Sequence, residues 1–231
     1  DDFRAIFWLA VIPGRASVTL LAIGLREPAQ PGPAVRSNPL RRDNVRRLGV
    51  GYLWVVVIGA LFTLARFSEA FLVLRAQQTG VPLALVPLVM VVMNLVYALS
   101  AYPFGRLSDR LPHTWLLIWG VLVLIAADLT LAASTHWAVM LAGVALWGVH
   151  MGMTQGLLAA MVAATAPADL RGTAYGLFNL VSGLAMLLAS LVAGWMWDSL
   201  GAAFTFYTGA AFCLLTLLVL LWRTGSTPDN G

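Results

Sequence analysis

The chain has 231 residues, of which 60% are hydrophobic and 10% charged, and its formal net charge is +4. Soluble domains are about 45–50% apolar and about 25% charged, so this composition excludes a soluble globular enzyme as well as a disordered chain. The single cysteine, Cys213, excludes an intrachain disulfide and a cysteine metal site. We therefore expect lipid to be the solvent for most of the chain.

Apolar stretches long enough to cross a bilayer, about 20 residues each, occur seven times along the chain. They comprise residues 7–25, 50–74, 83–104, 115–133, 138–164, 174–197 and 202–222. Helices are favoured over barrel strands because the stretches are long and do not alternate in polarity. The sequence therefore predicts an all-α membrane protein with seven transmembrane helices.

One connection between these segments is long. Residues 26–49 are rich in proline and arginine, which is typical of a solvated linker. A second interpretation, compatible with the first, places an amphipathic helix at the lipid headgroups from about residue 39 to residue 48. The chain starts with Asp1 and an apolar segment follows almost at once, so we expect it to be part of a longer protein.

The arginines predict how the helices are oriented, because basic residues accumulate in cytoplasmic loops. The side of the membrane that holds the linker carries ten arginines, and the opposite side carries two, Arg4 and Arg75. The ten are Arg26, Arg36, Arg41, Arg42, Arg46, Arg47, Arg106, Arg110, Arg171 and Arg223. We therefore expect a multi-pass protein of the inner (plasma) membrane, with its linker and C-terminus in the cytoplasm and Asp1 outside.

Seven helices with an outer N-terminus also fit a retinal protein or a receptor. All 14 basic residues are arginine, and without lysine no retinal Schiff base can form. Three passages point elsewhere: FWLAVIPG at residues 7–14, followed by REP at 26–28; GRLSDR at 105–110; and PADLRGTAYG at 167–176. They resemble, in this order, the sixth helix and its exit, the G-x-L-x-D-R loop between the second and third helices of a half, and the cytoplasmic start of the eleventh helix in bacterial members of the major facilitator superfamily.

Members of this family have two six-helix halves joined by a long cytoplasmic loop. The resemblance implies that residues 1–25 are the last helix of the N-terminal half, 26–49 the linker, 50–222 the whole C-terminal half and 223–231 a cytoplasmic tail. That half would form one bundle of two inverted three-helix repeats. The partners it implies are a small-molecule solute, membrane lipid and the missing N-terminal half.

The G-x-L-x-D-R loop has a gating role in this interpretation. Gly105 would let the backbone turn tightly, and Asp109, next to Arg110, would accept hydrogen bonds from helix amides or from an arginine of a neighbouring helix. Arg171, close to Asp169, is the candidate partner. Such a contact would keep the cytoplasmic side closed. The alternative is a solvated loop that only follows the positive-inside rule.

Ionisable side chains inside the membrane cost about 2.5–3.5 kcal/mol on insertion scales and usually face a cavity or a partner. Arg66 and Glu69 lie three residues apart in the second segment, so on a continuous helix they share one face and can pair. The family places this helix, its seventh, against the central cavity. We expect substrate contact, or proton coupling by Glu69; the alternative is a structural ion pair between two helices.

Other polar residues predict further cavity contacts. Asn94 and Tyr97 lie on one side of the third segment, where they could line the cavity or make an interhelical hydrogen bond. His150, in the fifth segment, can titrate near neutral pH, although a lone histidine in a helix is often a packing residue. Gln155 lies roughly 140° around that helix from His150, so the two need not face the same cavity. Asp128, near the outer end of the fourth segment, is interpreted as structural.

Glycines recur at four-residue spacing in the fifth and sixth segments. Small residues let helix backbones approach closely in lipid, so we interpret these glycines as packing positions. They include Gly148, Gly152, Gly156, Gly176 and Gly183.

No metal cluster, nucleotide-binding loop or nucleophile constellation is present in the sequence. We therefore expect no enzymatic activity, no cofactor, no metal and no nucleic-acid partner. The predicted function is secondary active transport of a small organic solute by alternating access, coupled to protons, with this chain as part of the transporter. The alternative is a multi-helix membrane receptor or scaffold that transports nothing.

Overall fold

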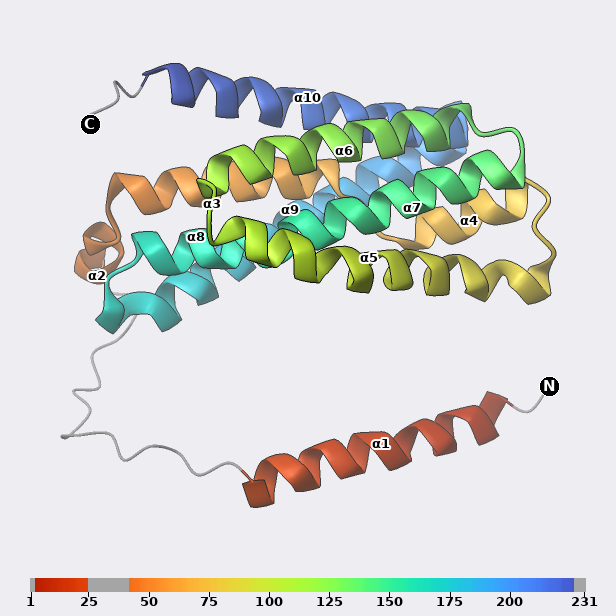
Figure 1. The fold of residues 1–231 in the computed structure, drawn as a ribbon, viewed down its shortest axis with the longest axis horizontal. Helices are drawn as coiled ribbons and strands as arrows, with labels where there is room; N and C mark the ends of the chain where they lie inside the picture. Colours follow the sequence, from red (N-terminus) through yellow and green to blue (C-terminus); the bar gives the residue numbers. More distant parts are fainter. Residues whose placement is uncertain (1–2, 25–41, 227–231) are drawn as a thin grey trace. The chain divides into compact units, whose positions relative to one another are not determined.

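The computed structural model describes residues 3–24 and 42–226 (Figure 1). The predicted linker, residues 26–49, lies largely outside the described residues, and so does part of the predicted tail. The chain divides into two compact units, Asp1–Asn38 and Pro39–Gly231.

The first unit contains helix α1, Phe3–Gly24. Pro13 lies inside this helix, and Ser17 Oγ donates a hydrogen bond of 2.9 Å to the Pro13 carbonyl oxygen. Thr19 Oγ1 donates in the same way to the Arg15 carbonyl oxygen, at 2.8 Å. Such bonds satisfy the hydroxyl groups within the helix itself, which suits a segment in lipid. The first predicted segment is therefore helical.

The second unit is built from helices throughout its described part. Long helices run up and down the bundle, and short helices precede or extend them. In chain order they are α2 (Arg42–Arg47), α3 (Gly49–Ala65), α4 (Ala70–Gln78), η1 (Leu83–Leu85), α5 (Val86–Ser108), α6 (His113–Ala133), α7 (Trp137–Thr154), α8 (Leu157–Thr165), η2 (Ala168–Leu170), α9 (Arg171–Leu200) and α10 (Ala202–Ser226).

The last six predicted segments are confirmed as helical spans of membrane-crossing length. They correspond to Gly49–Gln78, Leu83–Ser108, His113–Ala133, Trp137–Thr165, Ala168–Leu200 and Ala202–Thr224. Each prediction is right to within a few residues at either end, because a long apolar run is the strongest sequence signal of a membrane helix.

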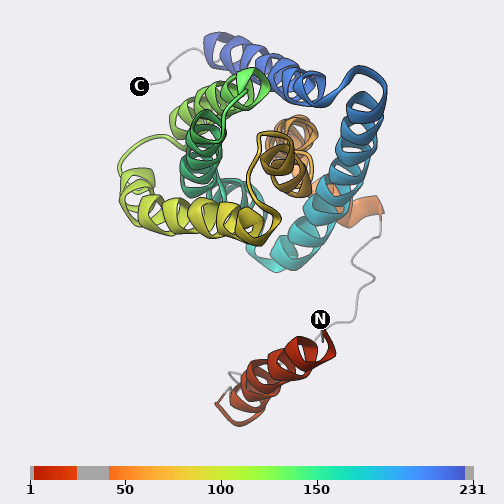
Figure 2. The same ribbon diagram turned by 90° about the vertical axis from the view of Figure 1, so that its right-hand side faces the viewer.

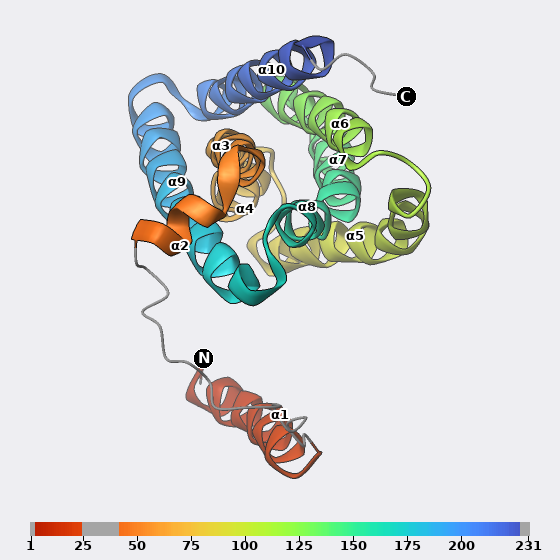
Figure 3. The same ribbon diagram turned by 90° about the vertical axis from the view of Figure 1, so that its left-hand side faces the viewer.

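The helices of the second unit surround a central pair. Viewed along the bundle, α3 and α4 lie in the middle of a ring formed by the other long helices (Figure 2, Figure 3). The most extensive packing joins α5 to α7, α6 to α7 and α6 to α10. The largest fully buried side chains are Trp147, Tyr52, Phe62 and Phe206, two of which belong to α3. The core therefore forms around the first span of the bundle.

The bundle has two ends, which differ in their connections (Figure 1). The α2 end carries α2 and the turns between α5 and α6 and between α8 and α9, and the opposite end carries the remaining turns. Tyr52 Oη donates a hydrogen bond of 2.8 Å to the Ala174 carbonyl oxygen, which joins α3 to α9. Tyr175 Oη donates one of 2.9 Å to the Ala159 carbonyl oxygen, which joins α9 to α8. These bonds hold the helices together near the α2 end.

Two of the six spans are interrupted, which the sequence analysis did not predict. The chain leaves the helical conformation at residues 66–68, between α3 and α4, and turns at Gln155 and Gly156, between α7 and α8. The first interruption follows 17 helical residues of a 30-residue span, and the second follows 18 of 29. The predictions of continuous helices over residues 50–74 and 138–164 were therefore wrong at these points.

Each interrupted span is the first of three consecutive spans. The span α3–α4 starts at the α2 end, whereas α7–α8 starts at the opposite end, so the two sets of three run in opposite directions (Figure 1). This is the order expected for two inverted three-helix repeats.

Two of the predicted packing glycines lie where α7 meets α5. A methyl group on Gly148 would lie 2.6 Å from the Met93 carbonyl oxygen, and one on Gly152 would lie 2.9 Å from Ser100 Cβ. Real side-chain carbons do not come so close to a backbone oxygen, so only glycine lets α7 approach α5 at Gly148.

The other three predicted packing glycines have open space around them. A methyl group on Gly156, Gly176 or Gly183 would have no neighbour within 4 Å among the described residues. The prediction of close helix contacts was therefore wrong for these three positions within the bundle. Gly156 belongs instead to the interruption between α7 and α8.

We expect Gly148→Ala to destabilise the bundle by about 1–3 kcal/mol, because the added methyl group must displace the α5 backbone. The matched control is Gly51→Ala in α3, where a methyl group meets nothing within 4 Å. Thermal unfolding of the purified protein in detergent micelles measures both. Equal unfolding temperatures for the two variants would contradict the described contact between α7 and α5.

Candidate functional site

Local hydrogen bonds satisfy backbone N–H groups at the interruption between α3 and α4. The Arg66 N–H donates to the Thr63 carbonyl oxygen at 3.0 Å, which closes the last turn of α3. The Ala70 N–H donates to Ser68 Oγ at 3.3 Å, and serine is a favoured residue just ahead of a helix. Ser68 is therefore the one local sequence signal for this break, since neither proline nor glycine occurs at residues 65–70.

Phe67 anchors the break in the core, where its side chain is only 4% exposed. The centroid of its ring lies 5.4 Å from that of Phe71, 5.6 Å from that of Trp147 and 5.5 Å from that of Phe206. The rings meet in tilted or edge-on geometry, as aromatic pairs prefer. Because these partners belong to α4, α7 and α10, the aromatic cluster holds the non-helical residues in the middle of the bundle.

A cavity of about 420 Å³ lies beside this interruption, and we call it the break cavity. Its lining comes from the break itself, from α7 and from α9. The lining residues are Arg66, Phe67, Ser68, Glu69, Trp147, Met186 and Ser190. A few polar groups set among apolar side chains are typical of a site for a small organic molecule.

Arg66 has no counter-ion in contact among the described residues. Its Nε is buried and makes no hydrogen bond there. Its guanidinium carbon lies 5.8 Å from the centroid of the Phe62 ring, which provides a cation–π contact. Glu69 lies within electrostatic reach of Arg66 but forms no ion pair with it. The prediction that the two residues share one face of a continuous helix was wrong, because α3 ends at Ala65.

His150 is packed inside the bundle. It is fully buried, and its Nδ1 lies 2.9 Å from the Gly120 carbonyl oxygen of α6. Its ring centroid lies 5.3 Å from that of Phe62 and 6.4 Å from that of Trp147. A carbonyl oxygen can only accept, so Nδ1 carries the hydrogen, and Nε2 stays buried without a partner among the described residues. These contacts are those of a packing histidine.

Tyr97 and Gln155 line a second cavity of about 270 Å³, which lies between α5 and the interruption of α7–α8. Gly105 and His113, from the last turn of α5 and the first turn of α6, also line it. The second cavity therefore lies nearer to the α2 end than the break cavity does.

Asn94 belongs to neither cavity. It is exposed on α5, and its side-chain amide donates 2.8 Å to the Met90 carbonyl oxygen of the same helix. The structure therefore separates the predicted site residues into Arg66 and Glu69 at the break cavity and Tyr97 and Gln155 at the second one. No group of three metal-binding side chains occurs within the described ranges.

Asp128 is a fully buried carboxylate outside both cavities. Neither of its oxygen atoms has a hydrogen-bond partner in the part of the chain that the structure describes. A methyl group on Gly209 of α10 would lie 2.7 Å from Asp128 Oδ2 and 2.9 Å from the Phe67 ring. Asp128 thus belongs to the close contact between α6 and α10.

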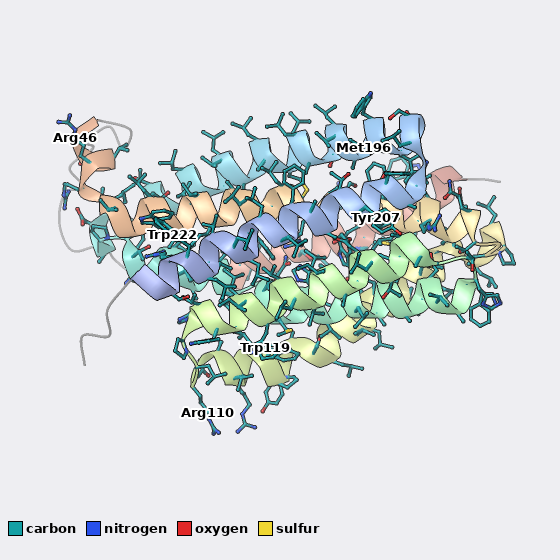
Figure 4. The ribbon with its side chains drawn as sticks, turned by 90° about the horizontal axis from the view of Figure 1, so that it is seen from above. Arg46, Arg110, Trp119, Met196, Tyr207 and Trp222 are labelled. Carbon is teal, nitrogen blue, oxygen red and sulfur yellow. The ribbon has the colours of Figure 1, made fainter. Side chains whose placement is uncertain are left out.

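The G-x-L-x-D-R segment differs from its predicted geometry. Gly105 lies within α5, which continues to Ser108, so no tight turn forms at this glycine. Neither Asp109 nor Arg171 makes a side-chain hydrogen bond or an ion pair with a described residue. Arg110 projects away from the helices near the α2 end (Figure 4). The predicted contact between Asp109 and Arg171 was therefore wrong for this conformation.

An ion pair at the α2 end involves Asp169 instead. Arg47 Nη2 lies 2.8 Å from Asp169 Oδ2 and joins α2 to η2. The two side chains are 53% and 58% exposed, so solvent screens their attraction. This pair is not predictable from the local sequence, because 122 residues separate its members and nothing local marks them.

Arg75 ties α4 to the end of α6. Its Nε donates to the Leu131 carbonyl oxygen and to Ser134 Oγ, at 3.1 Å each. Its Nη2 donates to the carbonyl oxygens of Ala132 and Ser134, at 3.1 and 2.7 Å. The last carbonyl groups of a helix lack partners within it and carry the negative end of its dipole. The guanidinium therefore stabilises this end both by hydrogen bonds and by its positive charge. Arg75 is therefore a structural arginine.

The sequence model of the Major Facilitator Superfamily matches residues 53–231, a region that includes both cavities and all six spans except the first four residues of the first span. The chain belongs to the major facilitator superfamily. The resemblance carried by the G-x-L-x-D-R and PADLRGTAYG passages is thereby confirmed, and the all-helical bundle is consistent with one half of such a protein. This member of the superfamily is a multi-pass membrane protein.

Curated relatives carry the same family name. A protein of Methanocaldococcus jannaschii, named an uncharacterized MFS-type transporter, is 32% identical over 173 residues, which cover 72% of this chain and 43% of that protein. Another from the same organism, with the same description, is 23% identical over 154 residues, or 67% and 40% of the two chains. An uncharacterized MFS-type transporter of Mycobacterium tuberculosis is 26% identical over 136 residues, or 59% and 24%. The chain spans less than half the length of these relatives.

The two arginine contacts of this major facilitator protein should differ in strength. We expect Arg75→Gln to lower the free energy of unfolding by about 2 kcal/mol or more, because four charge-assisted hydrogen bonds are lost at a helix end. Arg47→Gln should cost less than about 1 kcal/mol, because its pair is exposed. Denaturant unfolding of both variants tests this, and a larger loss for Arg47→Gln would reverse the assignment.

Proposed function

We propose that the chain is the C-terminal part of a secondary transporter that moves a small organic solute across the membrane by alternating access. The observation that carries this proposal is the break cavity. It places a glutamate, and an arginine that forms no ion pair with any described residue, beside an interruption of the central helix. Ionisable groups at this depth are costly and are kept for function. The transporter names of the relatives support the same proposal.

The partner that completes the transporter would be the N-terminal half. Two spans support this, because little of their most apolar stretch is covered by the bundle. Only 22% of that stretch is buried in Leu83–Ser108 and in Ala168–Leu200, against 56% in His113–Ala133. The greater length of the relatives also supports it. In this proposal residues 1–25 are the last helix of that half, 26–49 the linker, 50–222 the C-terminal half and 223–231 the tail.

The α2 end would face the cytoplasm of a cell with the protein in its plasma membrane. Arginines gather there, and Arg46 and Arg110 project from the same end of the bundle (Figure 4). Arg75 lies at the opposite end, where it serves α6. A contact at the α2 end, such as that of Asp169 with Arg47, would then form part of the cytoplasmic gate.

Labelling of single cysteines tests the orientation. In the Cys213→Ser background, a membrane-impermeant maleimide added to intact cells should label Gln77→Cys, at the end of α4, and leave Arg46→Cys, in α2, unlabelled. After permeabilisation both should react, since Arg46 and Gln77 are exposed. The reverse pattern in intact cells would turn the proposed topology around.

Proton coupling is assigned to Glu69. It lines the break cavity together with Arg66 and forms no ion pair with it among the described residues, and carboxylates within membrane segments are typical of proton relays in transporters. A movement of α3 relative to α4 would change the distance between Glu69 and Arg66, which lie at the break between these two helices. Protonation would thereby depend on conformation, which coupled transport requires.

Flux in proteoliposomes tests this role in the full-length protein. An imposed pH gradient should drive solute accumulation by the wild type, whereas Glu69→Gln should catalyse exchange without accumulation. Asp198→Asn, an exposed carboxylate-to-amide change at the end of α9, is the matched control and should behave as the wild type. If the gradient drives accumulation by Glu69→Gln as well, Glu69 is not the coupling group.

A further inference from the structure

The break cavity is lined by one basic residue, Arg66, and one acidic residue, Glu69, which form no ion pair with each other. Arg66 Nε is buried without a hydrogen-bond partner, and no ion pair joins Arg66 to Glu69, among the described residues. A buried N–H group without a hydrogen bond is costly, because it has lost water and gained nothing in exchange. Such a group is poised to receive an acceptor.

The surrounding charges do not supply that acceptor. Four groups lie close enough to Arg66 to interact with it electrostatically. They are Glu69, Tyr97, Cys213 and His150. His150 bonds to the Gly120 carbonyl oxygen and offers no anion. Asp128 lies in the contact between α6 and α10, and it does not line the break cavity.

The remaining lining fits an organic molecule with an acidic head. Ser68 and Ser190 add hydroxyl groups beside Arg66, and Trp147 and Met186 add apolar surface. A guanidinium presents its N–H groups in a planar fork that matches a carboxylate with two parallel hydrogen bonds, and it also binds phosphate and sulfonate groups. A volume of about 420 Å³ suits a small solute of this kind.

We infer that the break cavity binds a small organic oxyanion, with a carboxylate as the best match, through the guanidinium of Arg66. The hydroxyls of Ser68 and Ser190 and the apolar faces of Trp147 and Met186 hold the rest of the solute. Glu69 accepts a hydrogen bond from any amino or hydroxyl group that the solute carries. This inference rests on the proposed function, whose solute class it narrows.

Matched pairs of acids and amides test the inference on the purified full-length protein. The probes are phenylacetate against phenylacetamide and lactate against lactamide, with inorganic phosphate as a third arm. At least one carboxylate should raise the thermal unfolding temperature, its amide should not, and phosphate should stabilise less than the carboxylate does. Arg66→Gln should weaken carboxylate binding about tenfold or more, as expected for loss of a charged hydrogen-bond partner. Arg66→Lys, which keeps the charge but loses the fork, should weaken it less.

Arg46→Gln, the same change at an exposed arginine of α2, should bind as the wild type. Unfolding temperatures without ligand show whether each variant is folded. If Arg66→Gln does not fold, carboxylate binding by Arg66→Lys tests the inference. Stabilisation by amides as strong as that by acids, unchanged carboxylate binding by both Arg66 variants, or no effect of any acid would each overturn the inference. Stronger stabilisation by phosphate than by either carboxylate would overturn the preference for a planar organic acid.

Solute flux in proteoliposomes, measured beside ligand binding, separates this inference from the proposed transport. If proteoliposomes take up a neutral or cationic solute and Arg66→Gln leaves that flux unchanged, transport stands and the oxyanion site is refuted. If carboxylates bind with the predicted dependence on Arg66 but no solute crosses the membrane, the site stands and the proposed transport fails.

Discussion

The burial of Phe67 in a cluster of aromatic rings is the contact on which the central part of the molecule depends. A membrane helix can be interrupted only where protein replaces the lipid around the freed backbone groups. The ring of helices around α3 and α4 provides that environment (Figure 3). Phe67 fills the middle of it and meets Phe71, Trp147 and Phe206 from three other helices. The polar neighbours of Phe67 are thereby held beside a cavity instead of in lipid.

Two half-buried arginines of the first span, Arg66 at the break and Arg75 in the last turn of α4, show how placement decides role. Arg75 meets carbonyl oxygens at the end of α6, and its donors are used in the fold. Arg66 lies at the break with its Nε unused. Both carry the same charge in the same span, but among the described residues Arg66 keeps a buried N–H group without a partner, whereas Nε, Nη1 and Nη2 of Arg75 all donate hydrogen bonds. The distinction follows from the interruption, because a continuous helix would turn residue 66 to a different face.

Long apolar runs allowed the six spans and their order to be predicted, because the cost of burying polar backbone leaves few alternatives to a helix in lipid. The break at residues 66–68 was not predictable in the same way. It contains no proline or glycine, and Phe67 and Arg66 are tolerated in a helix. Only Ser68 hints at a helix start, and a single serine is too weak a signal. Gly156 was interpreted only as a packing position, because of its four-residue spacing from Gly152, so the second break was missed as well.

Contacts between residues that are distant in the sequence were also not predictable. The pairing of Arg47 with Asp169 depends on how α2 lies against η2, which no local pattern encodes. The prediction for Asp109 relied on a glycine turn, whereas α5 continues as a helix through Gly105. Glycine allows a turn but does not require one, and in lipid the helix keeps its backbone hydrogen bonds.

The two interruptions have a consequence for the proposed transport that neither has alone. Because their spans start at opposite ends and break at similar distances from the start, the breaks lie at different depths. The break cavity is displaced toward the opposite end, and the second cavity, with Gln155 and His113, toward the α2 end. Between them lies the stretch of α7 from Trp147 to Gln155, about 12 Å long at the rise of a helix. Alternating access requires a barrier that separates two approaches to one site, and His150 and Trp147 fill this stretch with buried side chains. In the proposed transport, a shift of α7 relative to α3 would move this barrier with respect to the break cavity.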